Sequence, residues 1–380
     1  MNLKIRFLLV ALFTGLIAVC DGVYGQKNET RPVTASQVEI KYHDGHEFSV
    51  YGRLHDERNF NRLPAKYETV VRPEVWNLSK NSAGISVMFR TNSPVIKVKW
   101  TLLNNTTLAN MAKIGVGGVD LYCLAGEKWE YVNSGVPYGK RNESTLIAGM
   151  DTTYKEFMIY LPLYDGIDTL EIGISDGSSI SRHENNGSAG IKPVVFYGTS
   201  ITQGGCASRP GMAYTTIISR RLGVEVINLG FSGNGRLEQS VGQAVCEVEA
   251  SLVVLDCLPN SPVDTIRKNA LPLIRQIRKC HPETPILLVE SSVTDASFFP
   301  QSELYSGNRN SNIRQQNGEL KLVFNQALSE GIIGLHYLEA DNLIGDDHEG
   351  TVDGVHPSDL GMLRLADKIQ SAIEEILKPE

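Results

Sequence analysis

The hydrophobic pattern of the chain changes near residue 191, and this change constrains the fold more than any other feature. Beyond it, short apolar runs alternate with segments in which apolar residues recur at helical spacing. The expected strands are residues 194–197, 224–229, 251–255, 285–290 and 334–338, and the clearest helical stripes are residues 212–222, 266–277 and 360–373. Such alternation predicts an α/β domain in which helices cover both faces of a parallel sheet. In such sheets the functional residues collect at the carboxyl ends of the strands.

The residues before this point, from about 33 to 176, have strand patterns instead. Apolar and polar residues alternate, and turns rich in Gly, Asn and Asp separate the runs. We expect a β-sandwich of jelly-roll type. The glycines of Gly115–Tyr122 lie inside it, and because no helix follows them we interpret them as bulges or tight turns. The predicted domains are a β-sandwich at 26–180, a linker at 181–190 and an α/β domain at 191–380.

The length of 380 residues and the net charge of -7 limit the classes of function. A chain of this length suggests two domains, each with a core of its own. Because the sequence is acidic and has no basic cluster, we expect neither nucleic acid nor an anionic membrane surface as a partner. The composition predicts a soluble globular protein, and the sequence leaves its oligomeric state open.

Residues 1–25 have the features of a secretory signal peptide. Basic residues precede an apolar run at 7–20, and small residues lead to Gly25. The run also resembles a bacterial lipoprotein signal, which would leave Cys20 lipidated on a membrane. Because Val19 is bulky for the position before that cysteine, we favour cleavage after Gly25. Both routes predict export, to the bacterial periplasm or the exterior.

Five cysteines follow the predicted signal peptide. They are Cys123, Cys206, Cys246, Cys257 and Cys280. Their number is odd and their spacing shows no pairs, so we expect at least one free thiol and infer no disulfide framework.

The first expected strand of the α/β region ends at Gly198-Thr199-Ser200, where a turn leads into a helix. A serine in such a turn is a candidate nucleophile, because the positive end of the helix stabilises negative charge that develops beside it. The same residues could instead cap the helix. The spacing argues against the elbow of the α/β-hydrolases, which requires Gly where this chain has Thr202.

Three further loops follow expected strands and carry glycines or polar side chains. They contain Gly230 and Gly233, Asn260, and the pair Asp353 and His356. Ester hydrolysis by a serine requires a base, a carboxylate that orients the base, and N–H donors for the oxyanion. Each loop alone could be a turn or a helix cap. Their joint occurrence after successive strands favours a serine hydrolase.

A metal hydrolase is the alternative chemistry. Asp346, Asp347 and His348 lie close in sequence to Asp353 and His356. The sequence lacks the His-Glu-x-x-His helix and the paired cysteines of common metal sites. We therefore interpret residues 346–348 as solvated loop charges, and expect neither a metal nor a cofactor.

Together the four loops resemble the signature blocks of the SGNH (GDSL-like) hydrolase family, which carry Ser, Gly, Asn and a final Asp-x-x-His. The resemblance implies a flavodoxin-like three-layer α/β/α domain and an acyl-enzyme mechanism. It implies that Ser200 is the nucleophile, His356 the base and Asp353 its partner. The N–H groups of Ser200 and Gly233 and the side chain of Asn260 would form the oxyanion hole.

A second motif extends the resemblance over nearly all of the mature chain. Gly118-Val119-Asp120-Leu121-Tyr122 resembles the Gly-x-Asp-Leu-Tyr signature of the β-domain that precedes the hydrolase in one bacterial branch of the family. The chain departs from the common pattern at Thr199 and Ser261, where many members have acids. This departure leaves the substrate more open than the chemistry.

The resemblance and the expected export imply a secreted serine esterase that hydrolyses small acyl esters, above all O-acetyl groups on a polysaccharide or oligosaccharide. Trp76, Trp100, Trp129 and Tyr122 are candidates for sugar contact, although core packing is the favoured role of each. Two alternatives stay open. One is an esterase or lysophospholipase for lipid-like acyl groups, and the other is a carbohydrate-binding protein without turnover.

Overall fold

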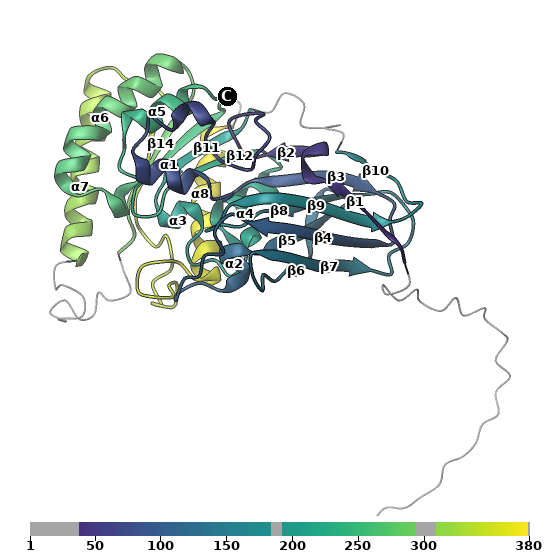
Figure 1. Cartoon of the computed structure of the whole chain (residues 1–380). Coiled ribbons are helices and arrows are strands. Elements are labelled where there is room, and N and C mark those ends of the chain that lie inside the picture. Colours follow the sequence, from purple (N-terminus) through teal and green to yellow (C-terminus); the bar gives the residue numbers. More distant parts are fainter. Residues whose placement is uncertain (1–37, 184–191, 294–308, 379–380) are drawn as a thin grey trace, which may run out of the picture. The chain divides into compact units, whose positions relative to one another are not determined.

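The computed structural model describes residues 38–183, 192–293 and 309–378 (Figure 1). Residues 34–380 belong to one compact unit. The predicted signal peptide, with Cys20, and most of the predicted linker lie outside the described residues. Within the described ranges, no helix is long and apolar enough to cross a bilayer.

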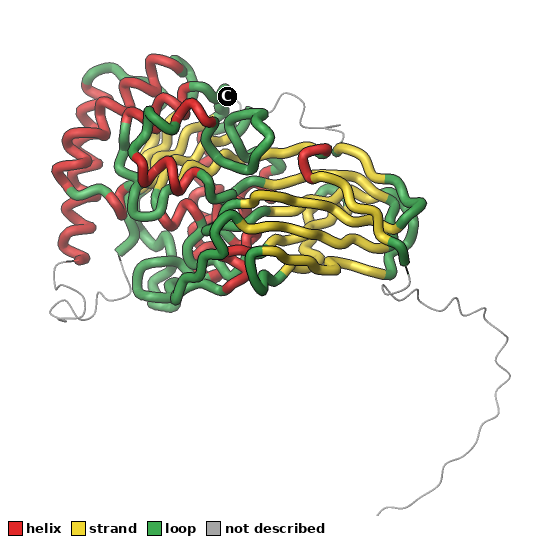
Figure 2. The backbone as a smooth tube through the Cα atoms, in the orientation of Figure 1, coloured by secondary structure: helices red, strands yellow, loops and turns green. Residues whose placement is uncertain are grey.

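Two antiparallel sheets form the β-sandwich predicted for the first part of the chain (Figure 2). One sheet has the order β1 (Ile40–Asp44), β9 (Ile167–Ser175), β4 (Val95–Leu102), β7 (Arg141–Ala148). The other has the order β10 (Ile180–Arg182), β3 (Ser86–Thr91), β8 (Lys155–Tyr160), β5 (Val119–Ala125), β6 (Lys128–Gly135), and β2 (Ser49–Tyr51) also pairs with β3. Successive side chains of a strand point to opposite faces, and the buried faces meet in a core that includes Phe89 and Trp100.

Two short helices interrupt this part of the chain, α1 (Pro73–Ser79) and α2 (Lys113–Gly117). The interpretation of the glycines in this segment as bulges or tight turns is wrong for Gly115 and Gly117, which lie within α2. A Cβ at Gly115 would lie 2.4 Å from the carbonyl oxygen of Ala207. Close contact with a segment of the α/β part therefore explains this glycine.

A five-stranded parallel sheet forms the centre of the second part, as predicted. Its order is β12 (Val226–Gly230), β11 (Val194–Gly198), β13 (Leu252–Asp256), β14 (Ile286–Val289), β15 (Leu335–Leu338), which is the 2-1-3-4-5 order of flavodoxin-like folds. The helices are α3 (Ser200–Gln203), α4 (Tyr214–Leu222), α5 (Gln239–Cys246), α6 (Val263–Cys280), α7 (Arg309–Ser329) and α8 (Asp359–Ile376).

The two faces of this sheet have separate cores. Val195 and Tyr197 point to the face covered by α5, α6 and α7, whereas Val194 and Phe196 point to the face covered by α4 and α8. The parallel register pairs Gly198 with Gly230 on one side and with Asp256 on the other. The loops that follow these three strands therefore begin at one edge of the sheet.

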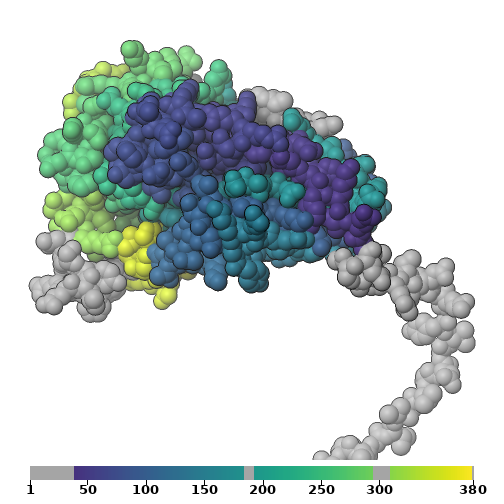
Figure 3. Space-filling view, viewed as in Figure 1, coloured from purple at the N-terminus to yellow at the C-terminus, as the bar shows by residue number. Residues whose placement is uncertain are grey.

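The segment between β2 and β3 packs on the α/β part, although it belongs to the first part in sequence. Leu63, Val71 and Val75 lie in the same core cluster as Val195. The guanidinium of Arg62 is fully buried and donates hydrogen bonds to backbone carbonyls, including those of Leu78, Asn81, Asn228 and Gly230. In Figure 3 this purple and blue segment lies against teal and green atoms.

Three of the four aromatic residues considered for sugar contact are core residues. Trp76, Trp100 and Tyr122 are buried, with exposed fractions of 8%, 1% and 2%. The indole of Trp100 donates to the carbonyl of Gly117 at 2.9 Å. Trp129 is half-buried and packs against Tyr122 and its neighbours. Core packing, the favoured prediction, therefore holds for the three buried residues.

A disulfide joins Cys246, at the end of α5, to Cys280, at the end of α6. Cys123, Cys206 and Cys257 are free. The expected free thiol is thus confirmed. The sequence does not predict the disulfide, because its cysteines are 34 positions apart and the packing of α5 on α6 brings them together.

Candidate active site

Ser200 is the first residue of α3 and follows β11 directly. The residue that caps this helix is Thr199, whose hydroxyl accepts a hydrogen bond from the N–H of Ile201. The hydroxyl of Thr202 in turn accepts from the N–H of Thr199, which completes a capping box. Thr199 therefore caps α3, and the candidate nucleophile is the next residue, Ser200. The Ser200 hydroxyl is not used for the cap and can serve another role.

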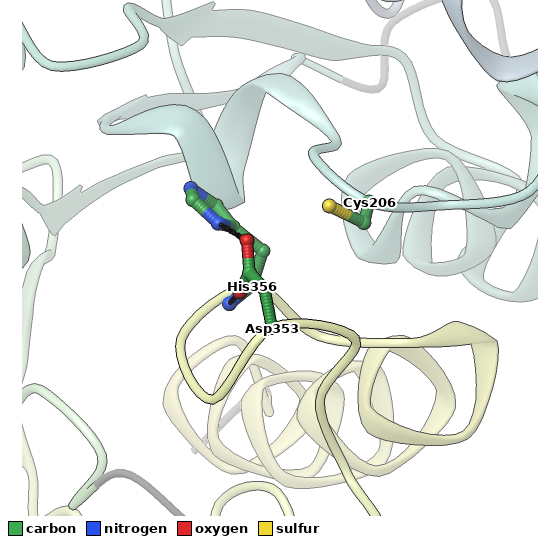
Figure 4. Close-up of side chains that lie close together, drawn as sticks. All are labelled: Cys206, Asp353 and His356. Carbon is green, nitrogen blue, oxygen red and sulfur yellow. Dashed lines mark hydrogen bonds and ion pairs between the residues drawn. The ribbon is translucent and has the colours of Figure 1, made fainter. Parts of the chain in front are cut away.

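The structure brings Ser200, His356 and Asp353 into one chain of hydrogen bonds. Ser200 Oγ lies 3.0 Å from His356 Nε2, and His356 Nδ1 lies 2.8 Å from Asp353 Oδ2. His356 and Asp353 belong to one loop before α8, as Figure 4 shows. In this order of atoms the imidazole can take a proton from the serine while the carboxylate holds the other ring nitrogen.

The Asp353 carboxylate is held from two directions. Its Oδ1 accepts hydrogen bonds from the N–H groups of Val355 and His356, at 3.1 and 2.8 Å. Its Oδ2 accepts from His356 Nδ1 and from Asn110 Nδ2, each at 2.8 Å. Burial acts to raise the pKa of Asp353, but these hydrogen bonds outweigh it and lower the pKa to about 2. The group is therefore a carboxylate at neutral pH.

Glycines let the nucleophile turn lie directly on the neighbouring loops. A Cβ at Gly198 would lie 1.9 Å from Thr202 Oγ1, and one at Gly235 would lie 2.0 Å from the carbonyl oxygen of Gly198. Real Cβ atoms do not approach so closely, so both positions need glycine. Gly230, which the sequence suggested as a turn former, also packs closely, since its Cβ would lie 2.2 Å from the N atom of Gln203.

The three residues whose N–H donors are predicted to form an oxyanion hole all line one cavity. The donors belong to the backbone of Ser200, the backbone of Gly233 and the side chain of Asn260. Among the described residues, no acceptor is hydrogen-bonded to any of the three. Asn260 Oδ1 is buried and also has no partner there. Unpaired donors beside a serine hydroxyl can stabilise an oxyanion that forms on a bound ester.

The cavity has a volume of about 510 Å³. Its wall combines apolar side chains, such as Val289, Ile313 and Leu343, with polar ones, such as Asn312 and Gln316. The amide of Gln316 donates to the carbonyl of Ser261 at 2.8 Å and thereby holds the loop that carries Asn260. A cavity with this lining can take an apolar acyl group and a polar alcohol portion.

Asp256 is the last residue of β13 and contacts the nucleophile turn through Thr202, a contact that the sequence does not predict. Its Oδ2 accepts hydrogen bonds from Thr202 Oγ1 at 3.0 Å and from Tyr214 OH at 2.9 Å. Burial raises the pKa of Asp256 to about 6, although both hydrogen bonds act against the rise. The carboxylate form is thus costly in the folded protein at neutral pH.

Replacing Asp256 by Asn is expected to stabilise the protein increasingly as the pH rises. Because the folded-state pKa is about 6, the unfolded chain loses this proton first, and wild-type stability falls between about pH 4 and about pH 6. The Asp256→Asn variant does not lose stability in this way, because asparagine does not titrate. Relative to wild type, its free energy of unfolding should rise by about 3 kcal/mol from about pH 4 to about pH 8 in urea titrations. If the difference in free energy of unfolding between the variant and wild type did not change with pH, the raised pKa of Asp256 would be contradicted.

Among the described residues, Cys206, Asp353 and His356 form a cluster whose ligand atoms, within 4.8 Å of one another, could hold a metal ion (Figure 4). Burial and the charge of Asp353 raise the pKa of the Cys206 thiol to about 12, whereas metals bind the thiolate. The Asp353 and His356 atoms already bond to each other. Asp347, from the acidic run before them, pairs with Arg364 at the surface. These contacts favour acid–base chemistry over metal binding.

The Gly-x-Asp-Leu-Tyr motif connects the β-sandwich to the loop after α3. Asp120 is fully buried, and its Oδ2 accepts hydrogen bonds from Arg209 Nη1 and from the N–H of Gly211, each at 2.8 Å. Arg209 Nη1 also donates to the hydroxyl of Tyr122 at 2.6 Å. The charged and aromatic positions of the motif thus hold the segment that follows the nucleophile helix.

Comparisons with known proteins agree with this geometry. Residues 191–374 match the GDSL-like Lipase/Acylhydrolase family, and residues 40–180 match GxDLY, the N-terminus of Esterase_SGNH_hydro-type. No curated protein gives a match. A solved structure from Bacteroides ovatus, described as a GDSL-like lipase, is 38% identical, with a TM-score of 0.84, over 90% of this chain and 99% of that one.

Two more distant structures share the fold. The salicylyl-acyltransferase SsfX3 from a tetracycline biosynthetic pathway is 17% identical, with a TM-score of 0.68, over 93% of this chain and 99% of that one. A family two carbohydrate esterase from Clostridium thermocellum, in complex with cellohexaose, is 12% identical, with a TM-score of 0.57, over 78% of this chain and 93% of that one. The family matches and the 38% identical relative decide the assignment: the chain belongs to the GDSL-like lipase/acylhydrolase family and is an SGNH-type esterase.

Proposed function

We propose that the protein is a serine esterase that removes small acyl groups, above all acetyl, from the hydroxyl groups of a polysaccharide or oligosaccharide. The observation that carries the proposal is the chain of hydrogen bonds from Ser200 through His356 to Asp353. It lies at a cavity where three N–H donors have no acceptor among the described residues.

His356 is the proposed base. Its Nε2 takes the proton of Ser200 as Oγ attacks the ester carbonyl carbon, and the charged imidazole is stabilised by Asp353. When the intermediate collapses, His356 returns the proton to the leaving alcohol, and the acyl group stays on Ser200. A water molecule, deprotonated by the same imidazole, then attacks the acyl carbon. The bond from this carbon to Ser200 Oγ breaks, the imidazole returns the proton to Oγ, and the carboxylic acid is released. No step of this scheme requires a metal ion or a cofactor.

Replacing Asn260 by Ala tests the proposed oxyanion hole. We expect kcat on a small acetyl ester to fall by about 10²- to 10³-fold with little change in KM, because the lost donor acts on the transition state. Asn325→Ala, at an exposed position of α7, is the control and should keep wild-type kcat. A loss below about threefold for Asn260→Ala would remove this side chain from the oxyanion hole.

A glycan as the alcohol portion is supported by two observations. The cavity wall carries polar side chains from α7, among them Asn312 and Gln316, which can bond to sugar hydroxyls. The fold is shared with family two carbohydrate esterases, one of them solved in complex with cellohexaose. An acetyl group needs only a small part of the cavity, and this leaves space for a sugar beside Ser200.

Export of the protein is part of the proposal. The first 25 residues have the pattern of a signal peptide. The disulfide between Cys246 and Cys280 supports an oxidising compartment, since such bonds persist outside the cytosol. Polymeric glycans would be accessible to the enzyme there.

The test is release of the free acid from a panel of acetylated polysaccharides and oligosaccharides, compared with acyl esters of increasing chain length. Enzyme treated with a serine-directed phosphonate is the control, and the adduct should map to Ser200. Acetate release from glycans at higher kcat/KM than from long-chain esters supports the proposal. Preference for long acyl chains would make the protein a lipid esterase, and failure of the phosphonate to react would favour a binding protein without turnover.

A further inference from the structure

One loop of the β-sandwich part reaches the histidine-bearing loop of the α/β part. Residues 103–112, here called the Asn110 loop, connect β4 to α2. From this loop Asn110 Nδ2 donates a hydrogen bond of 2.8 Å to Asp353 Oδ2. The two residues are 243 positions apart, and Oδ2 is the same oxygen that accepts from His356 Nδ1.

The Asn110 loop is fixed by a buried carboxylate. Asp165 has no exposed surface and accepts hydrogen bonds from the N–H of Asn104 at 2.9 Å and from the N–H of Thr106 at 2.7 Å. At the other end of the loop, Met111 packs against the core beneath α4 and α8. Asn110 is therefore presented to Asp353 from a segment that is anchored on both sides.

The contact supplies what the loop of Asp353 cannot supply itself. That loop provides two backbone N–H groups, both to Oδ1, and the histidine ring provides one donor to Oδ2. The amide of Asn110 is the second donor to Oδ2. With donors on both oxygens the plane of the carboxylate is fixed, and with it the direction in which Nδ1 of His356 must point.

We propose that Asn110 is a positioning residue of the esterase site, through which the β-sandwich part orients Asp353 and, through it, His356. The inference rests on the proposed function, because it requires that Asp353 acts with His356 in catalysis. It gives the β-sandwich part a direct role in the reaction, beyond packing.

The proposal is tested with Asn110→Leu, which keeps the size of the side chain and removes the donor. Thr107→Val is the control, since Thr107 lies on the same loop, is exposed, and its substitution likewise removes a polar group at similar size. We expect Asn110→Leu to lower kcat per titrated active site by about 10- to 100-fold, the range of a hydrogen bond to a charged group, with KM unchanged within about twofold. Thr107→Val should keep wild-type kcat.

Asn110→Asp adds a readout that a purely structural role would not move. A second carboxylate beside Asp353 raises the pKa of the pair, so the pair shares a proton at low pH and loses it as the pH rises. We divide the kcat/KM of each variant by that of the wild type at the same pH. This ratio should fall from about pH 6 to about pH 8 for Asn110→Asp and stay constant for Asn110→Leu. Of the other groups that face Asp353, Cys206 and Tyr164 each have a pKa raised to about 12 and do not titrate in this range. His356 faces the same carboxylate through Nδ1, which bonds to Asp353 Oδ2.

Active-site titration with a phosphonate separates the outcomes. A smaller number of titrated sites with wild-type kcat per site would mean that Asn110 only supports folding, and would overturn the proposal. Wild-type kcat in Asn110→Leu would overturn it as well. Either result leaves the proposed function intact as long as Ser200→Ala is inactive, whereas activity in Ser200→Ala would contradict the function itself.

Discussion

Replacing Ser200 by Ala is expected to lower kcat on a small acetyl ester by at least about 10⁴-fold and to leave the fold intact. The variant loses the atom that forms the acyl-enzyme, while the donors and the imidazole stay in place. Its side chain is smaller by one atom, and among the described residues the hydroxyl bonds only to His356 Nε2, at 3.0 Å. The thermal unfolding midpoint should therefore change little. Steady-state kinetics and thermal unfolding of the same preparation measure both effects.

A double variant gives the control for this prediction. If Ser200 and His356 act as one unit, the losses are not additive, and Ser200→Ala combined with His356→Ala should be no slower than Ser200→Ala alone. Activity retained by Ser200→Ala, at more than about a hundredth of the wild-type rate, would show that another group is the nucleophile. A further slowing in the double variant would show that His356 supports residual turnover without the serine.

The α/β half could be predicted because its signals are local. Each strand from β11 to β15 is a short apolar run, and alternate residues such as Val195 and Phe196 pack on opposite faces, as period-two burial requires. Because the strands are parallel, their carboxyl ends all lie at one edge of the sheet. The residues after those ends were thus expected together, and the contact of Ser200 with His356 agrees with that expectation.

The contacts that cross between the two halves could not be predicted. Arg62 looks like any surface arginine in the sequence, yet its guanidinium is buried and donates to the carbonyl of Gly230, the last residue of β12. Asn110 and Asp165 lie in two separate loops with no strand or helix pattern, and neither spacing nor composition connects Asp165 to the Asn110 loop or Asn110 to Asp353. Such contacts depend on how the two halves pack on each other. A hydrophobic periodicity of two or 3.6 residues predicts strands and helices, but it does not predict how the halves pack.

The second large effect is expected from Asp353→Asn. The carboxylate accepts from four donors, two on each oxygen, and all four are N–H groups. An amide has one acceptor oxygen and brings an NH₂ group. The backbone N–H groups of Val355 and His356 cannot turn away, so they hold the amide oxygen and the NH₂ faces His356 Nδ1.

An NH₂ group at that position donates to Nδ1 and forces the proton of the imidazole onto Nε2. The ring then cannot accept the proton of Ser200, and kcat should fall by about 10⁴-fold. Asp347→Asn is the matched control: it lies on the same stretch before α8, pairs with Arg364 at the surface, and should keep kcat within about twofold of wild type. Alanine removes the charge but does not donate to Nδ1, so it does not force the imidazole proton onto Nε2. Asp353→Ala should therefore lose less activity than Asp353→Asn. Equal activity of Asp353→Asn and wild type would mean that the imidazole is oriented by another group.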